Sequence, residues 1–329
     1  MNFEQLFASF AEIKVAVVGD VMLDTYWWGH VERISPEAPV PVVALDKKEV
    51  RIGGAGNVAL NLAALQSQVT VISVLGDDDN GKTLTQLFNQ NNINTNYLIT
   101  SEKRITTNKT RVISRDQHMM RLDTELISDI DAIDEDVLIK KIEQYILQEK
   151  PSVLIFEDYN KGVLTEKVIT KAIELCKKHN VITTVDPKRK NFFNYKGVDI
   201  FKPNLKEVKE GLNLLIEDIN ETSLKNIHEA LHKQLQHAVS FITLSEKGVF
   251  FHSNDSLQLI PSHNRYIADV SGAGDTVIAV ASLVYASSKD MQLAAEVANI
   301  AGGLVCEEVG TAAINKEKLL KECQLLLGN

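Results

Sequence analysis

Residues 269–286 read DVSGAGDTVIAVASLVYA, a glycine-rich turn followed by an apolar segment with helical spacing. Gly272 and Gly274 open this segment, so the backbone N–H groups and the dipole of the helix start favour negative charge there. Asp275 lies in the same turn, where a carboxylate can accept a proton from a hydroxyl while the N–H groups stabilise a transferring phosphoryl group. Alternatively, Asp275 is only an acidic first-turn residue that the dipole favours. The segment alone does not decide between the two.

Outward from this turn, strand-like and helix-like stretches alternate along the chain. Apolar runs rich in β-branched residues predict buried strands, and most are separated by stretches with helical spacing. The alternation predicts an α/β fold with a doubly wound, mainly parallel sheet flanked by helices. The strand runs begin at residues 15, 69, 153, 181, 199 and 238, and the helical stretches span 57–66, 81–91, 135–148, 165–179 and 222–236.

Two stretches break this alternation. Residues 25–52 contain three prolines around the alternating VPVVAL, and prolines of this kind are typical of an edge strand or an exposed sheet. Residues 94–123 contain a second alternating stretch, TNKTRVISRDQHMMRLD. We therefore expect a small β lid, formed by two insertions, on a single domain that spans residues 1–329.

Composition excludes several classes of protein. The 329 residues include 35 Lys and Arg against 44 Asp and Glu, a net charge of −9 that disfavours nucleic acid as a partner. Three cysteines, an odd number without Cys-x-x-Cys spacing, favour a reducing compartment over a disulfide framework or a zinc cluster. No apolar window is long enough to span a bilayer. The sequence predicts a cytoplasmic protein without a membrane partner.

Three other motifs resemble known ligand-binding patterns. Gly76 to Thr83 matches the phosphate-binding pattern GxxxxGK[ST]. Three successive aspartates, at 77–79, would repel a triphosphate. We therefore favour an acidic turn in which Asn80 caps the next helix. Gly54-x-Gly56-x-x-Ala59 resembles a dinucleotide fingerprint but follows the edge-strand candidate. His228-Glu229-x-x-His232 has zincin spacing without the third ligand of the extended motif, which favours histidines on the flank of a surface helix.

Four further segments resemble one family in their order along the chain. GDVMLD (19–24), GGAGN (53–57), KPNLKE (202–207) and DVSGAGD (269–275) are similar to the motifs of the ribokinase-like, or PfkB, family of sugar kinases. The resemblance covers almost the whole chain. Longer segments, among them RISPEAPVPVV, RVISRDQHMMRLD, DYNKG and VDPK, resemble those family members that phosphorylate heptose 7-phosphate.

The resemblance implies roles for individual residues on the ATP side. Gly272, Ala273 and Gly274 would form the anion hole, and Asp275 would be the catalytic base. Asn204 and Glu207 would help to place ATP and Mg²⁺, Glu207 through water, although a capping Asn followed by an ordinary helical Glu is the alternative. In some family members a monovalent cation, K⁺, is bound at the positions of Asp269 and the carbonyls near Gly310. Residues expected to line the nucleotide pocket are Thr243, Ser245, Gly248 and Asn299.

On the acceptor side, the resemblance implies that Asp24 and Asn57 hydrogen-bond sugar hydroxyls and that Gly53 and Gly54 allow close approach of the backbone. A phosphate on the acceptor requires cations. Arg111 and Lys161 are our candidates, although spacing does not rank them above the other two cations in or beside the lid. Those two are Lys109 and Arg121. The chain departs from the family pattern at Glu157, where relatives usually have a small residue.

These observations predict an enzyme that uses ATP and Mg²⁺ to phosphorylate O1 of D-glycero-D-manno-heptose 7-phosphate, on the route to nucleotide-activated heptose for lipopolysaccharide. A different sugar acceptor, a P-loop enzyme using Lys82, and a non-catalytic sugar-phosphate sensor are the alternatives. Exposed lid edges predict a homodimer through the lid. Because the chain ends at Asn329, we expect no nucleotidyltransferase domain and a separate adenylyltransferase acting downstream.

Overall fold

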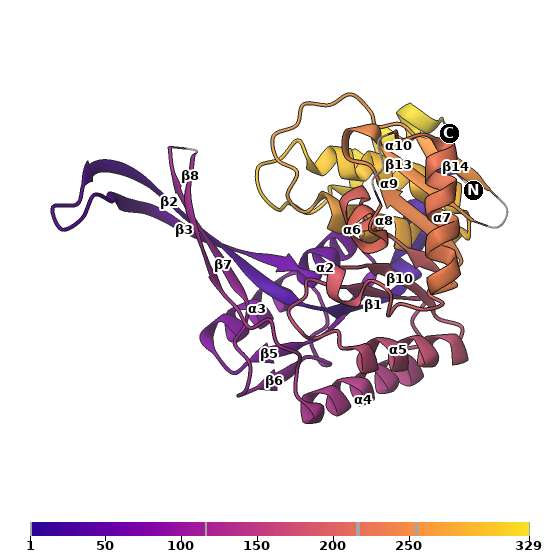
Figure 1. Ribbon diagram of the computed structural model, residues 1–329, viewed down its shortest axis with the longest axis horizontal. Helices are drawn as coiled ribbons and strands as arrows, with labels where there is room; N and C mark the ends of the chain where they lie inside the picture. Colours follow the sequence, from indigo (N-terminus) through magenta and orange to yellow (C-terminus); the bar gives the residue numbers. More distant parts are fainter. Residues whose placement is uncertain (1, 116, 215–217, 254–255, 329) are drawn as a thin grey trace.

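The body of the molecule is built on a twisted central sheet, seen in the computed structural model, which describes residues 2–115, 117–214, 218–253 and 256–328 (Figure 1). Its strand order is β14-β13-β12-β11-β10-β9-β1-β4. The strands from β4 to β12 are parallel, and β13 and β14 complete one edge in antiparallel orientation. They are β1 (Lys14–Gly19), β4 (Gln68–Ile72), β9 (Val153–Glu157), β10 (Ile182–Asp186), β11 (Ile200–Phe201), β12 (Val239–Thr243), β13 (Val249–His252) and β14 (Leu257–Ile260).

Helices cover both faces of this sheet, which confirms the predicted α/β class. Each face has its own apolar core, because side chains of successive residues in a strand point to opposite faces. One core contains α1 (Phe3–Ser9), α2 (Ala55–Ala64), α3 (Asp79–Gln90), α8 (Ala273–Ser288), α9 (Met291–Val305) and α10 (Lys316–Leu327). The other contains α4 (Ala132–Glu149), α5 (Glu166–Lys178), α6 (Leu205–Leu212) and α7 (Glu221–Leu235). The short helices are η1 (Phe10–Glu12), η2 (Arg189–Asn191) and η3 (Ser245–Lys247).

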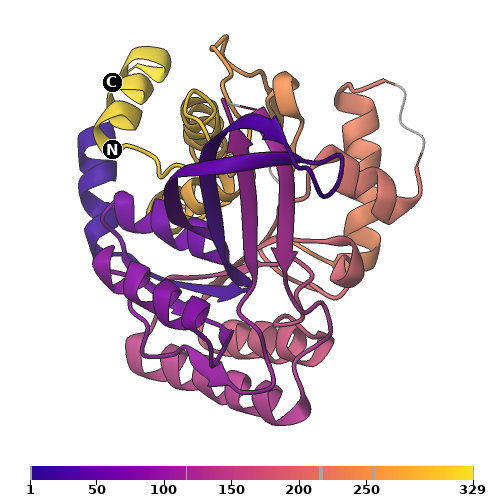
Figure 2. The ribbon, with the colours of Figure 1, turned by 90° about the vertical axis from the view of Figure 1, so that its left-hand side faces the viewer.

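A second sheet, the lid, projects from the body (Figure 1) and lies in front of it when the molecule is viewed from that side (Figure 2). Its order is β3-β2-β7-β8, with β3 at one edge as the prolines predicted. Strand β2 is antiparallel to β3 and parallel to β7, and β7 is antiparallel to β8. The strands are β2 (Val21–Ile34), β3 (Pro41–Gly54), β7 (Asn108–Ser114) and β8 (Gln117–Thr124).

The second insertion is shorter than the predicted 94–123. Its first part does not enter the lid, because β6 (Ile99–Ser101) pairs in parallel with β5 (Val74–Gly76) beside the body. Only the stretch from Asn108 onward pairs with the lid strand β2. The expected lid is therefore present, with a later starting point.

Two expectations from composition can be compared with the structure. Cys176, Cys306 and Cys323 are free thiols, in line with the prediction of no disulfide framework, and all three are buried. Among the helices of the described residues, none combines the length and the apolar character needed to cross a bilayer.

Candidate functional site

The carboxyl ends of the parallel strands converge on one edge of the central sheet. Gly19 at the end of β1, Glu157 at the end of β9 and Asp186 at the end of β10 are in register across three neighbouring strands. In open α/β sheets this edge is where ligands bind.

The start of α8 faces this edge and is not capped by a side chain. Gly272 is its N-cap residue, with a φ of 79°, a left-handed conformation that favours glycine. A Cβ at this position would lie 2.7 Å from Asn57 Nδ2, so an L-residue would also displace the Asn57 amide that holds Asp275. The N–H groups of the first turn therefore point toward the site without a side-chain acceptor among the described residues.

Asp275, in that first turn, is buried and has two hydrogen-bond donors. Asn57 Nδ2 donates to Oδ2 and the Tyr159 hydroxyl donates to Oδ1, each at 2.8 Å. Burial raises the pKa of Asp275 to about 6, although the two donors oppose this shift. The result is a fixed carboxylate that is ionised at neutral pH and still basic enough to take a proton.

Two lysines, the buried Lys202 and the half-buried Lys188, lie near this turn. Lys202 Nζ is 2.7 Å from Asp186 Oδ2, and a Cβ at Gly274 would lie 3.6 Å from the same oxygen and 3.8 Å from Lys202 Nζ. Lys188 Nζ bridges Asp186 at 3.2 Å and Glu207 at 2.6 Å. Burial opposes the charge of Asp186, but the two lysines hold its pKa below the ordinary value. The anion site therefore has ammonium groups as well as backbone donors.

Sequence reasoning did not select these lysines, although it quoted both segments that contain them. Lys188 closes VDPK after β10, and Lys202 opens KPN after β11. A lysine next to a proline at the end of a buried strand was the available signal. That these lysines lie at the anion site depends on the pairing of strands that are far apart in the sequence.

Asn204 and Glu207 form a capping box at the start of α6. Asn204 Oδ1 accepts from the Glu207 N–H at 2.9 Å, and Glu207 Oε2 accepts from the Asn204 N–H at 2.8 Å. The other Glu207 oxygen binds Lys188. Both the capping role and a place beside the anion site are thus present, and a water-mediated contact of Glu207 with Mg²⁺ stays a prediction.

The other expected nucleotide-pocket residues lie farther along the same sheet edge. Thr243, at the end of β12, forms a bridge with Asn204. Ser245 and Gly248 form a turn in which a Cβ at Gly248 would lie 2.0 Å from the Ile260 carbonyl oxygen. Asn299 on α9 donates to the Pro261 carbonyl oxygen at 2.8 Å. Gly248 and Asn299 therefore contact the same segment after β14, and their binding of ATP stays a prediction.

The acceptor-side residues gather where the lid joins α2. Asp24 on β2 is buried and forms an ion pair with Arg111 on β7. A Cβ at Gly53 would lie 2.4 Å from Asp24 Oδ2, which explains the need for glycine there. Gly54, with a φ of 60°, is the N-cap residue of α2, and the buried Asn57 Oδ1 has no hydrogen-bond partner among the described residues. Asn57 thus holds Asp275 with its N–H group and presents an acceptor atom for a ligand hydroxyl.

Asp20 fixes the loop that follows β9. Its carboxylate accepts from the backbone N–H groups of Tyr159 at 2.9 Å, Lys161 at 3.0 Å and Val163 at 3.0 Å. This places the Tyr159 hydroxyl on Asp275 and brings Lys161 to the lid, where it pairs with Glu125 at 2.7 Å. Sequence reasoning did not select Asp20 or Tyr159, although GDVMLD and DYNKG contain them.

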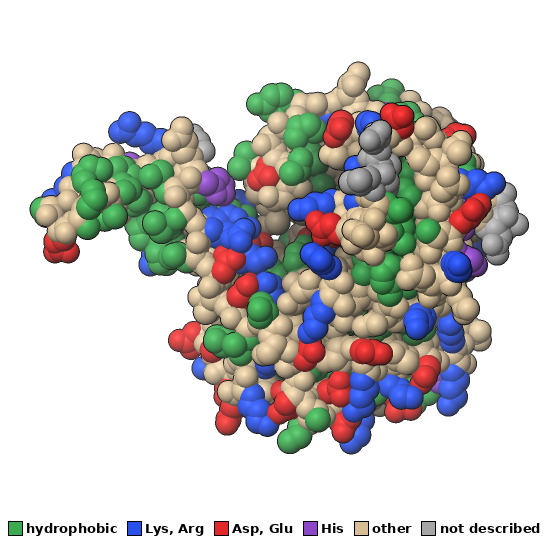
Figure 3. Space-filling model, viewed as in Figure 1, with side chains coloured by type: hydrophobic (Ala, Val, Ile, Leu, Met, Phe, Trp, Pro, Cys, Tyr) green, Lys and Arg blue, Asp and Glu red, His purple; other side chains and the backbone are tan. Residues whose placement is uncertain are grey.

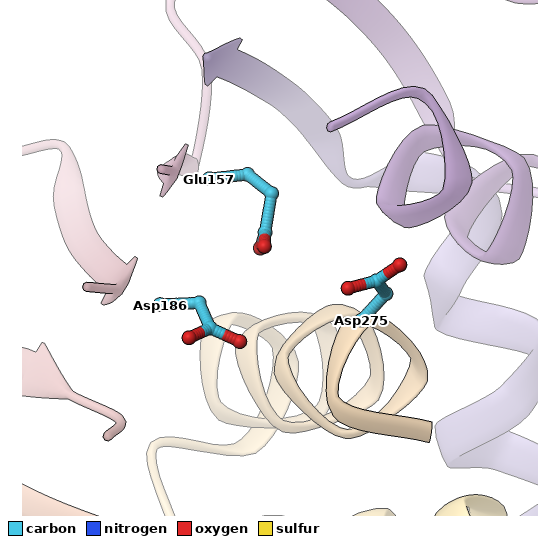
Figure 4. A group of neighbouring side chains, drawn as sticks. All are labelled: Glu157, Asp186 and Asp275. Atoms are coloured by element: carbon cyan, nitrogen blue, oxygen red, sulfur yellow. The ribbon is translucent and has the colours of Figure 1, made fainter. Parts of the chain in front are cut away.

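Glu157 is fully buried, and neither carboxylate oxygen has a partner among the described residues. Burial, with the nearby charges of Asp186 and Asp275, raises its pKa well above the ordinary value. Figure 4 shows the three carboxyl groups pointing toward one another, with one oxygen of each within 4.8 Å of the others. Asp186 and Asp275 have other partners, so Glu157 is the member of this all-oxygen set that is free to bind a hard divalent cation such as Mg²⁺.

The groups expected to bind K⁺ have other partners. Asp269 Oδ1 accepts from the Ser271 N–H at 3.0 Å, and Oδ2 accepts from the Gly310 N–H at 2.9 Å. The carbonyls of Val309 and Thr311 both accept from Arg51 Nη1 at 3.2 Å. This loop presents an N–H to Asp269, and its flanking carbonyls bind a guanidinium, so the residues present do not fit a monovalent cation here.

The Walker-like segment does not contribute to this site. Asp78, and not the predicted Asn80, caps α3: its Oδ1 accepts from the Gly81 N–H at 2.7 Å, and its Oδ2 accepts from the Thr106 N–H at 2.7 Å. Lys82 is exposed and lies 3.5 Å from Asp79. An acidic turn was the correct interpretation, with the wrong capping residue.

The dinucleotide-like and zincin-like patterns also have structural explanations. Gly54 to Ala59 connect the lid edge strand β3 to α2, as the prolines suggested. His232 is exposed, but His228 is buried, contrary to the expected flank position. His228 lies under β13, where its ring stacks on His252 with centroids 3.9 Å apart and its Nδ1 is 2.9 Å from Ser240 Oγ. His228 therefore belongs to the packing of α7 on the sheet, and the exposed His232 lies with its Nδ1 2.8 Å from the His237 carbonyl oxygen.

A buried base at an uncapped helix start, with two lysines beside it, is the arrangement of an enzyme that transfers a phosphoryl group to a hydroxyl. The sequence model of the pfkB family of carbohydrate kinases matches residues 12–318. The chain belongs to this family and is a sugar kinase.

Curated relatives are similar over nearly the whole chain. The bifunctional protein HldE of Geobacter sulfurreducens is 37% identical over 97% of this chain, and that of Aliarcobacter butzleri is 40% identical over 93%. The match covers 64% and 63% of those proteins. The chain thus spans less than two thirds of the length of these relatives.

Solved structures share the fold at lower sequence identity. Arabidopsis thaliana ribokinase, complexed with ribose and ATP, has a TM-score of 0.72 at 16% identity, over 94% of this chain and 99% of that one. Phosphofructokinase-2 from Escherichia coli, in complex with potassium, has a TM-score of 0.78 at 17% identity, over 96% and 99%. These likenesses establish a ribokinase-like α/β fold.

Proposed function

We propose that this kinase transfers the γ-phosphoryl group of ATP to O1 of D-glycero-D-manno-heptose 7-phosphate and forms the 1,7-bisphosphate. The observation that carries the proposal is the buried Asp275, whose oxygens are held by Asn57 and Tyr159 at the uncapped start of α8. The acceptor choice is supported by the segments that resemble heptose 7-phosphate kinases and by the similarity to HldE proteins.

In this reaction Asp275 accepts the O1 proton while O1 attacks the γ-phosphorus. The new O1–P bond forms, the bond from the γ-phosphorus to the β–γ bridging oxygen breaks, and ADP leaves with that oxygen. The N–H groups of Ala273 and Gly274, together with Lys202 and Lys188, stabilise the charge on the transferring group. Asp24 and Asn57 hold the acceptor hydroxyls, with Gly53 and Gly54 allowing close approach.

Mg²⁺, when bound with ATP, neutralises phosphate charge in such reactions. Glu157 and its neighbour Asp186 are the residues that would hold it, with Glu207 reaching it through water. No step is assigned to K⁺, because the loop of Asp269 and Gly310 does not fit it.

The direct test is ATP turnover by the purified protein with D-glycero-D-manno-heptose 7-phosphate, read by phosphorus NMR. Ribose, fructose 6-phosphate and an acceptor-free sample are run in parallel. We expect heptose-dependent turnover with a new anomeric phosphate signal. Turnover only on another sugar would reject the acceptor and keep the sugar-kinase class, and turnover on none would favour the sensor alternative.

The proposal also implies partners for this kinase. The 1,7-bisphosphate is upstream of an activated sugar, so a phosphatase-type step and an adenylyltransferase activity would follow this reaction. A second copy of this chain would cover the lid, which exposes apolar side chains on three of its strands. These are Ile34, Leu45, Val50, Met119, Met120 and Leu122.

The dimer has its own test. Light scattering of the wild-type protein is expected to give twice the chain mass, and Met120→Lys with Leu122→Lys is expected to give the monomer, because two charges would be buried at the interface. A wild-type protein that stays monomeric at micromolar concentration would remove the dimer and leave the kinase reaction unaffected.

A further inference from the structure

Four cations surround the acceptor side of the site, and three of them have carboxylate partners. Arg111 pairs with Asp24, Lys161 Nζ lies 2.7 Å from Glu125, and Arg121 Nε lies 2.8 Å from Asp123. On the face seen in Figure 3, Lys and Arg side chains gather where the lid meets the body. Pairing removes most of the charge that three of these cations could offer to a ligand.

Lys109 is the fourth cation, and it has no carboxylate within ion-pair distance among the described residues. It is half-buried on β7, and burial, with repulsion from nearby Lys161, lowers its pKa, although the charges of Asp24 and Glu125 oppose this shift. A partly buried ammonium group without a carboxylate in direct contact is unfavourable. Such a group is stabilised when an anionic ligand binds beside it.

The position of Lys109 relates it to the reacting atoms. Its Nζ lies 5.5 Å from the centroid of the Tyr159 ring, and the hydroxyl of that ring donates to Asp275. Lys188, which belongs to the anion site, lies 5.6 Å from the same centroid. Lys109 also pairs in register with Asp24 across β2 and β7. A ligand held by Asp24 and approached by Asp275 would therefore have Lys109 beside it.

We propose that Lys109 binds the phosphate group that the acceptor already carries. This rests on the proposed function, because it assigns a subsite for a phosphorylated sugar. Arg111 is then a positioning residue that holds the Asp24 carboxylate, and the cation that selects a phosphorylated acceptor is the one without a carboxylate of its own.

The test compares two ligands on one variant. Binding of heptose 7-phosphate and of the unphosphorylated heptose is measured by calorimetry, without nucleotide, for the wild type and Lys109→Met. The variant is expected to bind the phosphorylated sugar about 10- to 100-fold more weakly, the usual effect of losing a charge-assisted hydrogen bond. Binding of the unphosphorylated sugar is expected to change less than about twofold, since no charge pairs with Lys109 there. Lys167→Met removes an exposed lysine that pairs with Glu135 and Asp136 and serves as the control.

Thermal unfolding separates a ligand-binding role from a structural one. Lys109→Met removes an unpaired charge and keeps the length of the side chain, so the unliganded variant is expected to be at least as stable as the wild type. In turnover, the loss is expected in KM for the phosphorylated acceptor, with kcat largely kept.

Three results would overturn the subsite. They are equal losses for both ligands, no loss for either, or a variant that unfolds at a clearly lower temperature with both affinities reduced. If the wild type proves to use another phosphorylated sugar, the same comparison is made with that sugar and its unphosphorylated form. If it uses only an unphosphorylated sugar, the subsite is rejected and the kinase class stands.

Discussion

Two glycine-containing turns in this molecule lead into helices and differ in their chemistry. In residues 76–83, the Asp78 carboxylate binds the N–H of Gly81 and occupies the start of α3. In residues 269–275, Gly272 caps α8 without a side chain, and the buried Asp275 and Lys202 lie at this helix start. The glycine pattern alone therefore does not define an anion site. What distinguishes the two turns is whether the protein's own side chain already accepts from the helix start.

The largest expected effect comes from removing the base at the uncapped turn. Asp275→Asn keeps the size of the side chain but cannot take the acceptor proton, so kcat should fall about 10²- to 10⁴-fold. Steady-state kinetics measures this, with ATP binding and the unfolding temperature as controls for folding. Near-normal turnover would mean that another group acts as the base.

A second substitution breaks the geometry of the same turn. Gly272→Ala introduces a Cβ 2.7 Å from Asn57 Nδ2 at a residue whose φ is 79°. We expect kcat/KM to fall about 10-fold or more. The backbone strain should also lower the free energy of unfolding by about 1–3 kcal/mol. Gly197→Ala is the matched control, because its φ is 75° and its Cβ would meet only the flexible end of Lys177. Equal loss of activity in the two variants would show that backbone strain, and not the contact with Asn57, is responsible.

The pH profile sharpens the comparison further. Because the pKa of Asp275 is raised to about 6, the base is protonated below that pH, and kcat/KM should fall about tenfold per pH unit there. Above it the profile should be flat until another group titrates. A profile that stays flat down to pH 5 would contradict the burial of this carboxylate in solution.

In residues 76–83, where Asp78 occupies the helix start, a substitution is expected to reduce stability and leave activity unchanged. Asp78→Ala leaves the N–H groups of Gly81 and Thr106 without their acceptor, which should cost about 1–2 kcal/mol in unfolding free energy. Chemical denaturation measures the cost, and the kinetic constants of the folded variant should match the wild type. A selective loss of ATP affinity would instead assign a ligand to this turn.

The smallest effect is expected at Lys82. Its side chain is exposed and lies near Asp79 only, so Lys82→Ala should change kcat/KM less than about twofold. This variant, assayed beside Asp275→Asn, distinguishes the family mechanism from a P-loop enzyme. Loss of activity at Lys82 with retention at Asp275 would reverse the assignment of the two turns.

Most of the fold could be predicted from the sequence, because buried parallel strands and amphipathic helices have distinct local patterns. The order of the strands, and hence the meeting of Glu157, Asp186 and Lys202, could not, since it depends on pairing across long separations. Residues 94–107 were assigned to the lid because alternation does not say which sheet a strand joins. His228 was misplaced because its helix position is covered by β13, which the sequence pattern of α7 does not show.

In the candidate site, too, local features could be predicted from the sequence and long-range contacts could not. Asp275 and the glycines around it could be selected from one segment, because the chemistry of a helix start is local. Tyr159 and Lys188 could not, since each acts through a partner from another strand. The four acceptor-side cations could be named from the sequence, and only their carboxylate partners separate Lys109 from the rest.

The most direct test of the contrast between the two turns is the amide NMR spectrum of the protein with and without ADP and a fluoride mimic of the transferring phosphoryl group. We expect large shifts for the N–H groups of Ala273, Gly274 and Asp275, because they would donate to the mimic. The N–H of Gly81, held by Asp78, is expected to stay unchanged. Large shifts at Asp79 to Lys82, with none at Ala273 to Asp275, would contradict the account.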